Sequence, residues 1–337
     1  MPLINARVVV AIPTLAAGDV LPECLASLET QSFRDFAVIV IDNSGKGFAS
    51  GLTSASYPLH VLQNDRNVGF GAAINQAAAA SSGEYVATLN DDCTASPDWL
   101  QELVRVADRE YEIGLCAAQV RLAENGLIDS AGMLIARDGA SKQRGFRQSP
   151  DRFQKDNEVL FPSGCSALYR RDMLEDVGGF DESFFLYCED TDLGLRARWA
   201  GWQAYYSAKA VVTHRYSHSA GRSSEMKAFL VERNRIVTAL KNFPARDLAI
   251  VPIAAPVRYL FHLLALARGR GITAEFSRES KGPWNLPVIL CKAHWHVLRN
   301  WPLIWKKRKA IKRRLEPRQM SVLLKRHRIS LYSVASL

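Results

Sequence analysis

Residues 85–92 read Tyr85-Val86-Ala87-Thr88-Leu89-Asn90-Asp91-Asp92, an apolar run of strand length that passes directly into one amide and two carboxylates. Apolar runs of similar length occur twice earlier in the chain. Ala37 to Ile41 precedes Asp42, and Val8 to Ile12 precedes Pro13, where we expect the first strand to stop. Short, continuous apolar runs of this kind are typical of strands buried on both faces of a sheet.

Helical and strand patterns alternate around these runs. Apolar residues recur at helical spacing from Leu21 to Thr30, Gly71 to Ser81 is an Ala-rich helical stretch, and Leu59 to Leu62 is a further strand. The order strand, helix, strand, strand, helix, strand predicts a doubly wound α/β sheet. Such sheets bind ligands beyond the carboxyl ends of their strands. The polar residues that follow the strands here are Thr14, Asp42, Asn67 and the cluster Asn90-Asp91-Asp92.

Composition excludes a disordered chain. Of the 337 residues, 48% are hydrophobic and 23% charged, which is ordinary for a folded protein. The net charge of +9 is uneven, because Lys292 to Arg328 holds thirteen Lys and Arg against one acid, Glu316, a net +12. The rest of the chain therefore carries −3. Electrostatically, the sequence predicts a slightly acidic body and a strongly basic tail.

The six cysteines contain no C-x-x-C pair, so we expect reduced thiols in a cytoplasmic protein rather than a disulfide framework or a zinc knuckle. Met1 to Arg7 has none of the features of a secretory signal. The longest apolar stretch, Leu248 to Ala267, is interrupted by Pro252 and Pro256, which disfavours a membrane-spanning helix.

The cluster Asn90-Asp91-Asp92 has two interpretations. Adjacent carboxylates repel each other unless a cation or hydrogen-bond donors lie between them, and oxygen-rich sites suit Mg²⁺ or Mn²⁺ bound to a substrate's phosphates. Alternatively, the acids precede a helix that starts near Ser96-Pro97-Asp98 and serve at its N-terminus. The residues alone leave both open.

A second acidic cluster, Glu189-Asp190-Thr191-Asp192, follows the aromatic-rich stretch Phe180 to Tyr187. Acids in the first turn of a helix complement its dipole. A carboxylate beside apolar rings, however, is partly desolvated and more basic, which suits a general base. Because Asp192 and Arg196 are four residues apart, we expect them to pair on the helix surface. Glu189 and Asp190 then remain for chemistry.

His214 ends the predicted strand Val211-Val212-Thr213-His214. A single histidine is more often a packed or surface residue than a metal ligand. It becomes a candidate ligand here because a cation held by Asp92 needs further donors.

These motifs together resemble the family 2 glycosyltransferases. The nucleotide-sugar half of the family is similar to Val8–Thr14, Val38–Ser44, Arg66–Gly71 and Asn90-Asp91-Asp92, and the acceptor half to Glu189–Asp192 and His214. The resemblance covers about residues 7–243. Its rhamnosyltransferase-like subgroup shares the asparagine-first acidic motif.

The resemblance implies a GT-A fold, a Rossmann-like mixed sheet on which Mg²⁺ or Mn²⁺ holds a nucleoside diphosphate-sugar. It implies that Thr14, Asp42 and Asn67 hold the base and ribose, with Asn90 and Asp91 also in the donor site. Asn90 replaces the first acid of the family's D-x-D motif, so Asp92 is the expected metal ligand, with His214 as its partner. Asp190 matches the catalytic base of inverting members and Glu189 its supporting neighbour.

We therefore predict a catalytic domain over residues 1–245, with a nucleotide-sugar half over about 1–113 and an acceptor half over 114–245. Residues 246–337 are predicted to form a helical, basic, membrane-associating region. Within this region, the pattern from Val257 to Arg268 predicts a helix whose polar stripe is formed by Arg258 and His262. Tryptophans beside cations fit a helix lying on an anionic membrane; a solvated basic helix packed on the body is the alternative. The tryptophans are Trp295, Trp301 and Trp305.

The predicted activity is inverting, metal-dependent transfer of a sugar, with L-rhamnose from dTDP-rhamnose favoured, to a glycan or polyprenyl-diphosphate-linked acceptor in cell-envelope polysaccharide synthesis. Galactofuranose or another UDP-sugar is the alternative donor. We expect a protein on the inner face of the cytoplasmic membrane. Two other classes of protein are considered. A nucleic-acid binder is disfavoured by the acidic body of the chain. A non-catalytic nucleotide sensor would not need Glu189 and Asp190.

Overall fold

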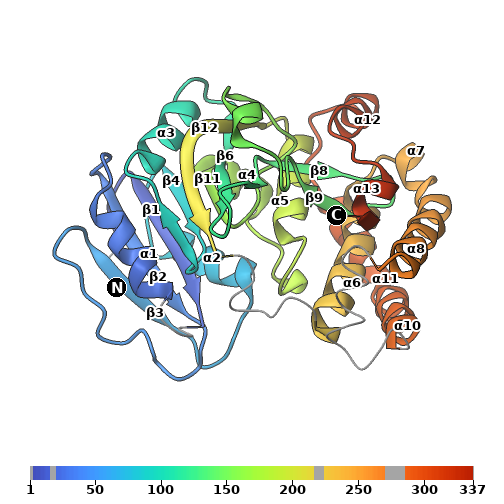
Figure 1. Cartoon of the computed structure of the whole chain (residues 1–337), viewed down its shortest axis with the longest axis horizontal. Helices are drawn as coiled ribbons and strands as arrows, with labels where there is room; N and C mark the ends of the chain where they lie inside the picture. The colour runs from blue at the N-terminus through green and yellow to red at the C-terminus, as the bar shows by residue number, and fades with distance from the viewer. Residues whose placement is uncertain (1–2, 16–19, 216–223, 270–284, 337) are drawn as a thin grey trace. The chain divides into compact units, whose positions relative to one another are not determined.

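The computed structural model describes residues 3–15, 20–215, 224–269 and 285–336 (Figure 1). The chain divides into two compact units. Unit 1 comprises residues 1–133 and 143–219, and unit 2 comprises residues 134–142 and 220–337. The helix at the end of the predicted catalytic domain therefore groups structurally with the basic tail. The functional boundary at residue 245 stays a prediction.

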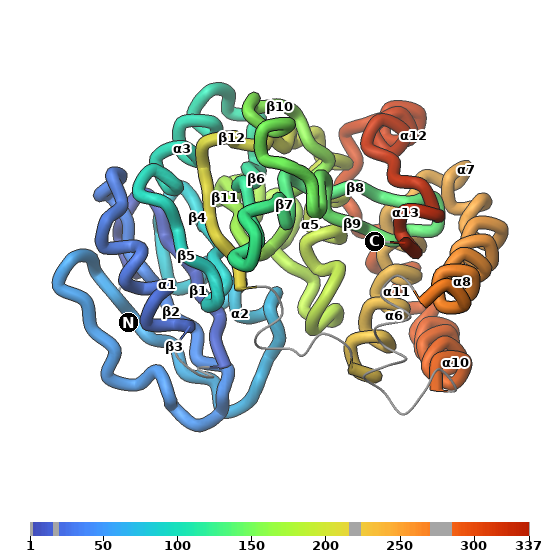
Figure 2. Tube along the Cα trace, viewed as in Figure 1, coloured from blue at the N-terminus to red at the C-terminus, as the bar shows by residue number. Residues whose placement is uncertain are grey.

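Unit 1 is built on a mixed sheet with the strand order β10-β12-β6-β11-β4-β1-β2-β3 (Figure 2). The strands β4, β1, β2 and β3 run parallel, β11 lies antiparallel between β4 and β6, and β12 is parallel to β6. Two short strands, β5 and β7, pair with β12 and β6. The bounds are β1 Val8–Thr14, β2 Phe36–Asp42, β3 Leu59–Gln63, β4 Tyr85–Leu89, β5 Cys93–Ala95, β6 Ile113–Leu122, β7 Ile128–Ser130, β10 Asn157–Glu158, β11 Ser166–Arg170 and β12 Gln203–His214.

Helices cover both faces of this sheet because successive strand residues point to opposite sides. On β1, Val8, Val10 and Ile12 pack against one face with α1 and α3. Val9 and Ala11 pack on the other face with α2, α4 and α5 (Figure 1). The doubly wound α/β fold predicted from the sequence is confirmed. The helices are α1 Val20–Glu29, α2 Phe70–Ala79, α3 Trp99–Ala107, α4 Arg171–Val177 and α5 Glu189–Trp199.

The prediction that the first strand stops at Pro13 is wrong. β1 continues to Thr14, and Pro13 is the register partner of Ile41 in β2. On the other side, β1 pairs with β4 only as far as Ala11. A proline lacks the backbone N–H of a ladder donor but is tolerated where a strand has a free edge, and β1 has such an edge beyond Ala11.

The expected pair of Asp192 and Arg196 forms, but not on the surface. Arg196 Nε lies 2.8 Å from Asp192 Oδ2, and both side chains are buried. Arg196 also donates to the carbonyl oxygens of Val177 and Gly179, at 2.7 Å each. The pair is buried because α5 is surrounded by protein on almost every side. Through these bonds, Arg196 holds the loop after α4 in place.

Unit 2 combines the tip of the hairpin of β8 and β9 with the C-terminal helices. α10 and α11 pack against α6, and α13 packs against α8. The expectation of a helical C-terminal region is confirmed. No helix in the described parts of the chain is long and apolar enough to cross a membrane. The bounds are β8 Met133–Ile135, β9 Ser141–Gln143, α6 Glu225–Asn242, α7 Ala245–Leu248, α8 Val251–Ala267, α10 Asn285–Arg299, α11 Trp301–Ala310, α12 Pro317–Arg326 and α13 Leu331–Ser336.

A buried ionic network joins three parts of unit 2. Arg258 of α8 pairs with Asp138 of the hairpin and, at 2.7 Å, with Glu232 of α6. Arg235 of α6 pairs with Glu232 and lies 3.5 Å from Asp138. Although burial opposes it, the two guanidinium charges lower the pKa of Glu232. Arg258, predicted as part of the polar stripe of this helix, is therefore buried in an ion-pair network.

Candidate functional site

The carboxyl ends of β1 and β4 bring Thr14 and Asp91 together. The hydroxyl of Thr14 donates a hydrogen bond of 2.6 Å to Asp91 Oδ2, and both residues are buried. They meet because parallel neighbouring strands end at the same edge of the sheet. The predicted donor-site cluster is therefore contiguous at this point.

Asp42 and Asn67 shape the loops that follow β2 and β3. Asp42 accepts hydrogen bonds from the backbone N–H groups of Ser44 and Ala49, at 2.8 Å each. Burial opposes ionisation, but these bonds lower the pKa of Asp42, so it is a carboxylate at neutral pH. Asn67 Oδ1 accepts a bond of 2.9 Å from the N–H of Gly69 at the start of α2. Their predicted contacts to base and ribose stay predictions.

Gly69 is one of the places where the two halves of unit 1 touch. Its φ is +88°, and a Cβ there would lie 2.3 Å from the carbonyl oxygen of Phe185. The next residue, Phe70, donates its N–H to the same oxygen at 2.9 Å. Only glycine permits both this conformation and this close approach. The turn after β3 is thereby joined to the loop that carries the second acidic cluster.

That loop is conformationally strained. Phe185, Tyr187 and Cys188 all have positive φ values, of 65°, 68° and 65°. Such conformations cost roughly 1 kcal/mol or more each in residues with side chains and gather at functional sites. The strain ends at Glu189, the first residue of α5. The loop therefore delivers Glu189 and Asp190 in a fixed orientation.

The two acids differ in their surroundings. Asp190 is partly exposed; its Oδ2 accepts from the Gly164 N–H at 3.0 Å, and its Oδ1 accepts from the N–H of Thr191 at 2.6 Å. Glu189 is buried, and within the described chain its Oε2 has no hydrogen-bond partner. Burial and the charge of Asp190 raise the pKa of Glu189 to about 8. Burial also raises the pKa of Asp190, against its hydrogen bonds.

The segment before β11 links the two acidic clusters. Gly164 donates its N–H to Asp190, and the carbonyl oxygen of the next residue, Cys165, accepts from the N–H of Asn90 at 2.9 Å. Two adjacent residues thus hold one acid of α5 and the turn after β4. The predicted catalytic pair and the predicted metal motif are therefore connected through these two residues.

His214 lies between two carboxylates. Its Nδ1 is 2.8 Å from Asp129 Oδ2, and its Nε2 is 3.3 Å from Asp92 Oδ1. Among the described residues, that oxygen of Asp92 accepts no hydrogen bond. Burial would lower the pKa of His214, but Cys165 and the two carboxylates raise it strongly. A histidine fixed by a carboxylate at one nitrogen is the usual arrangement in metal sites.

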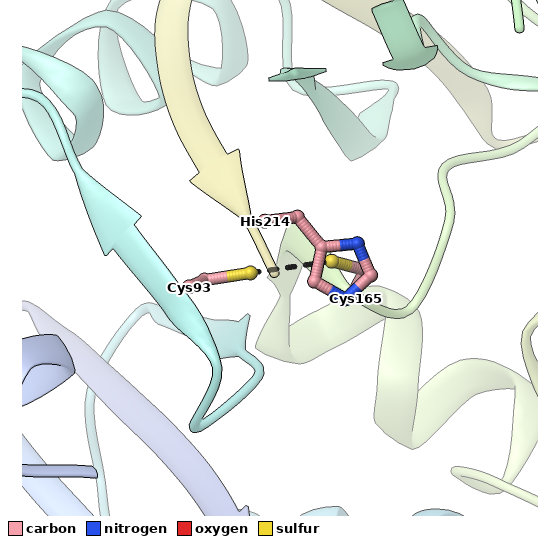
Figure 3. A group of neighbouring side chains, drawn as sticks. All are labelled: Cys93, Cys165 and His214. Atoms are coloured by element: carbon pink, nitrogen blue, oxygen red, sulfur yellow. Dashed lines mark hydrogen bonds between the residues drawn. The ribbon is translucent and has the colours of Figure 1, made fainter. Parts of the chain in front are cut away.

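Two thiols adjoin this histidine. Cys93 Sγ and Cys165 Sγ are 3.4 Å apart, and one donor atom from each, together with a ring nitrogen of His214, lie within 4.8 Å of one another (Figure 3). The hydrogen bond with Cys93 lowers the pKa of Cys165 to about 7, against the effect of burial. Burial raises the pKa of Cys93.

Sequence reasoning found the acids and the histidine but missed Asp129, Cys93 and Cys165. Asp129 lies in the short strand β7 among glycine-rich turns, and a single acid in such a segment gives no signal of its own. Cys93 directly follows the acidic motif, which is a signal that could have been used. Cys165 is joined to it only by the tertiary fold.

Comparison with solved structures identifies the fold class. The structure of GalNAc-T7 with UDP, GalNAc and Mn²⁺ matches with a TM-score of 0.61 and 14% identity, covering 74% of this chain and 50% of that chain. Mannosyltransferase PcManGT from Pyrobaculum calidifontis, in complex with GDP-Man and Mn²⁺, matches with a TM-score of 0.51 and 17% identity, over 99% and 87% of the chains. The fold is GT-A, as predicted.

The sequence defines the family within that fold. Residues 9–178 match glycosyl transferase family 2, and the chain belongs to this family. N-acetylglucosaminyl-diphospho-decaprenol L-rhamnosyltransferase of Mycobacterium tuberculosis is 31% identical over 238 residues, 64% of this chain and 77% of the relative. O-antigen chain rhamnosyltransferase RfbN of Salmonella typhimurium is 24% identical over 217 residues, 63% and 68%. The protein is a glycosyltransferase similar to rhamnosyltransferases, and both predictions are confirmed.

Proposed function

We propose that this glycosyltransferase is inverting and metal-dependent, and that it transfers L-rhamnose from dTDP-rhamnose to a polyprenyl-diphosphate-linked glycan in cell-envelope polysaccharide synthesis. The observation that carries the proposal is that Gly164 hydrogen-bonds to Asp190, while the next residue, Cys165, hydrogen-bonds to Asn90 in the turn that carries Asp92. The carboxylate of Asp92 suits a cation, and that of Asp190 suits an attacking hydroxyl. Displacement at an anomeric carbon requires both functions.

The residues present fit a divalent cation. Asp92 Oδ1 is buried without a hydrogen bond from any described residue, and it lies 3.3 Å from a histidine nitrogen. Asp129 contacts the other nitrogen of His214, Nδ1, as a carboxylate commonly does beside a histidine that ligates a metal. We propose that Asp92 and His214 hold Mg²⁺ or Mn²⁺. When bound, the ion would neutralise charge on the departing nucleoside diphosphate. Mn²⁺ is present in the GalNAc-T7 and PcManGT structures.

Asp190 is the proposed base. Its Oδ2 accepts one backbone bond of 3.0 Å, whereas Oδ1 accepts a bond of 2.6 Å and a second from the Thr191 hydroxyl at 3.1 Å. Oδ2 therefore has more capacity left to accept the proton of an acceptor hydroxyl. With its pKa near 8, Glu189 is protonated at neutral pH and adds no second charge beside Asp190. We therefore propose Asp190, whose negative charge contributes to the raised pKa of Glu189, as the ionised member of the pair.

The donor and acceptor are proposed from the relatives. The Mycobacterium tuberculosis relative is named for rhamnosyl transfer to an N-acetylglucosaminyl-diphospho-decaprenol, and the Salmonella relative for an O-antigen chain. The test is a panel of dTDP- and UDP-sugars with Mn²⁺ or Mg²⁺, read by thermal stabilisation and by transfer to a polyprenyl-diphosphate N-acetylglucosamine. Selective stabilisation and turnover with dTDP-rhamnose are expected. Preference for a UDP-sugar such as UDP-galactofuranose would contradict the donor assignment.

We also propose that unit 2 attaches to the inner face of the cytoplasmic membrane. Large apolar side chains are exposed on α8 and on α10, including Leu263 at 61% and Trp295 at 66%. Trp301 and Trp305 of α11 stack with ring centroids 5.9 Å apart and precede the densest cations. Exposed rings beside cations suit the headgroup region of an anionic bilayer. At the membrane surface, the enzyme would have access to a lipid-linked acceptor.

A further inference from the structure

We propose that Cys93, Cys165 and His214 form a binding site for a thiophilic divalent cation of the Zn²⁺ class, distinct in its ligands from the site proposed for Mg²⁺ or Mn²⁺. Two sulfurs and one imidazole nitrogen are a donor set that zinc, cadmium and cobalt accept readily. Magnesium and manganese prefer oxygen. Within the parts of the chain that the structure describes, these residues form a group of three cysteine and histidine side chains whose ligand atoms lie close enough to share an ion.

The three donors are already close to a coordinating geometry. They lie within 4.8 Å of one another, and the two sulfurs are 3.4 Å apart (Figure 3). In a tetrahedral site with zinc–sulfur bonds of about 2.3 Å, two sulfurs lie roughly 3.8 Å apart. The two sulfurs would therefore need to separate by only a few tenths of an ångström, within the reach of side-chain torsions, to ligate one ion.

The backbone holds the donors in place. His214 of β12 and Cys93 of β5 are register partners in an antiparallel ladder, so their separation is set by strand pairing. The third donor, Cys165, is fixed by the hydrogen bond from Asn90 to its carbonyl oxygen. Three segments far apart in sequence thus converge on this site. Preorganisation of this kind favours ion binding.

Asp129 contacts one of the two ring nitrogens of His214. Because Nδ1 contacts Asp129, we assign Nε2 as the ligand atom of the proposed site, in the carboxylate–histidine arrangement that raises the basicity of a ligating imidazole. Binding would release the protons of the two thiols, so that two thiolates neutralise the charge of the ion. Cys93 is buried and Cys165 is partly exposed, which gives an ion a side of approach.

The consequence for catalysis rests on the function proposed above. Nε2 of His214 cannot serve two ions at once, and Asp92 Oδ1 lies 3.3 Å from the same atom. A thiophilic cation would therefore withdraw His214 from the proposed donor metal and inhibit transfer. The site would make the enzyme sensitive to zinc-class ions.

The test of binding needs no substrate. The reduced, chelator-treated full-length protein is titrated with Co²⁺ and followed by its thiolate-to-cobalt charge-transfer band. One equivalent is expected to bind. The band should be lost in Cys93→Ser and Cys165→Ser and unchanged in Cys291→Ser, which removes an exposed thiol of unit 2. Asp129→Asn should weaken binding by about 10–100-fold. No charge-transfer band in the wild type, or an equal band in the two serine variants at sites 93 and 165, would overturn the proposal.

A second arm separates this inference from the proposed function. Thermal unfolding of the serine variants is compared with wild type to establish that they fold. Zn²⁺ should then inhibit rhamnosyl transfer by the wild type and inhibit Cys165→Ser at least tenfold less. Cobalt binding without activity on any nucleotide-sugar would contradict the proposed function and leave the metal site standing. Activity on a nucleotide-sugar without a cobalt–thiolate band would contradict the thiophilic metal site and leave the proposed function standing.

Discussion

Asp129 Oδ2 lies 2.8 Å from Nδ1 of His214, and this contact determines which ring nitrogen meets Asp92. Nε2 is the remaining atom and is 3.3 Å from Asp92 Oδ1. Both side chains are buried, and their facing atoms are close enough to form an ion pair or to hold a shared divalent ion. The metal predictions depend on this arrangement.

Asp92→Asn is expected to weaken Mn²⁺-dependent nucleotide binding at least tenfold, because an amide cannot offset the charge of the cation. His214→Ala should weaken it less, since water can replace a neutral ligand. The measurement is calorimetric titration of dTDP with and without EDTA. If the affinity for dTDP is unchanged by EDTA and by both substitutions, the assignment of a metal to this site is wrong.

Asp190→Asn is expected to lower kcat by about 10²–10⁴-fold while donor affinity stays close to that of the wild type, because a general base acts on the acceptor and not on the nucleotide. The matched control is Glu189→Gln, which keeps the protonated form that burial favours and should retain most of the activity. Turnover is measured at saturating donor. If Asp190→Asn is active and Glu189→Gln is not, the two roles are exchanged.

The pKa of Glu189, near 8, also predicts how stability depends on pH. An acid whose pKa rises on folding binds more protons in the folded state, so the free energy of unfolding falls as pH increases from the unfolded value of 4.5 towards 8. The loss is on the order of a few kcal/mol, since each pKa unit corresponds to about 1.4 kcal/mol. Glu189→Gln should remove this part of the dependence.

The measurement is urea unfolding of wild type and Glu189→Gln at several values between pH 5 and 8, without added metal. The difference between the two proteins isolates Glu189, because other titrating groups are common to both. Parallel stability curves across this range would show that Glu189 is ionised in the folded protein.

Arg258→Met is expected to destabilise unit 2 by roughly 3–5 kcal/mol, because it leaves Asp138 and Glu232 with only Arg235 to balance two buried carboxylates. Arg246→Met, at an exposed position of α7, is the control and should change stability by less than about 0.5 kcal/mol. Urea unfolding of both variants checks the difference. Equal, small effects would mean that the network contributes little.

Local patterns were sufficient to predict the parallel strands and the polar residues at their ends, because burial on both faces of a sheet leaves a continuous apolar run. They could not predict contacts made between distant segments. Asp129 and His214 are 85 residues apart, and Arg258 and Asp138 are 120 apart. The pairing of Asp192 with Arg196 was predictable from helix geometry, whereas its burial depends on what packs around α5.

The tail offers a test of membrane attachment by two kinds of substitution. Lys306→Gln with Lys309→Gln removes two exposed cations of α11. Trp295→Ala with Leu298→Ala removes two apolar side chains of α10 that are 66% and 63% exposed. Arg308 is left unchanged, because it donates to the carbonyl oxygens of Leu240 and Phe243 at the end of α6. A whole-tail deletion would also remove that contact.

Sedimentation with anionic and neutral vesicles at low and high salt measures the two contributions. Each lysine near an anionic surface contributes about 1 kcal/mol, so the lysine pair should lower binding by roughly 10–30-fold at low salt and have little effect at high salt, where surface charges are screened. The apolar pair should weaken binding at both salt concentrations, since its contribution is not mainly ionic. If wild type and both variants sediment equally, or if none of them sediments with any vesicle, membrane attachment is contradicted. The alternative, a basic helix face exposed to solvent, is then favoured.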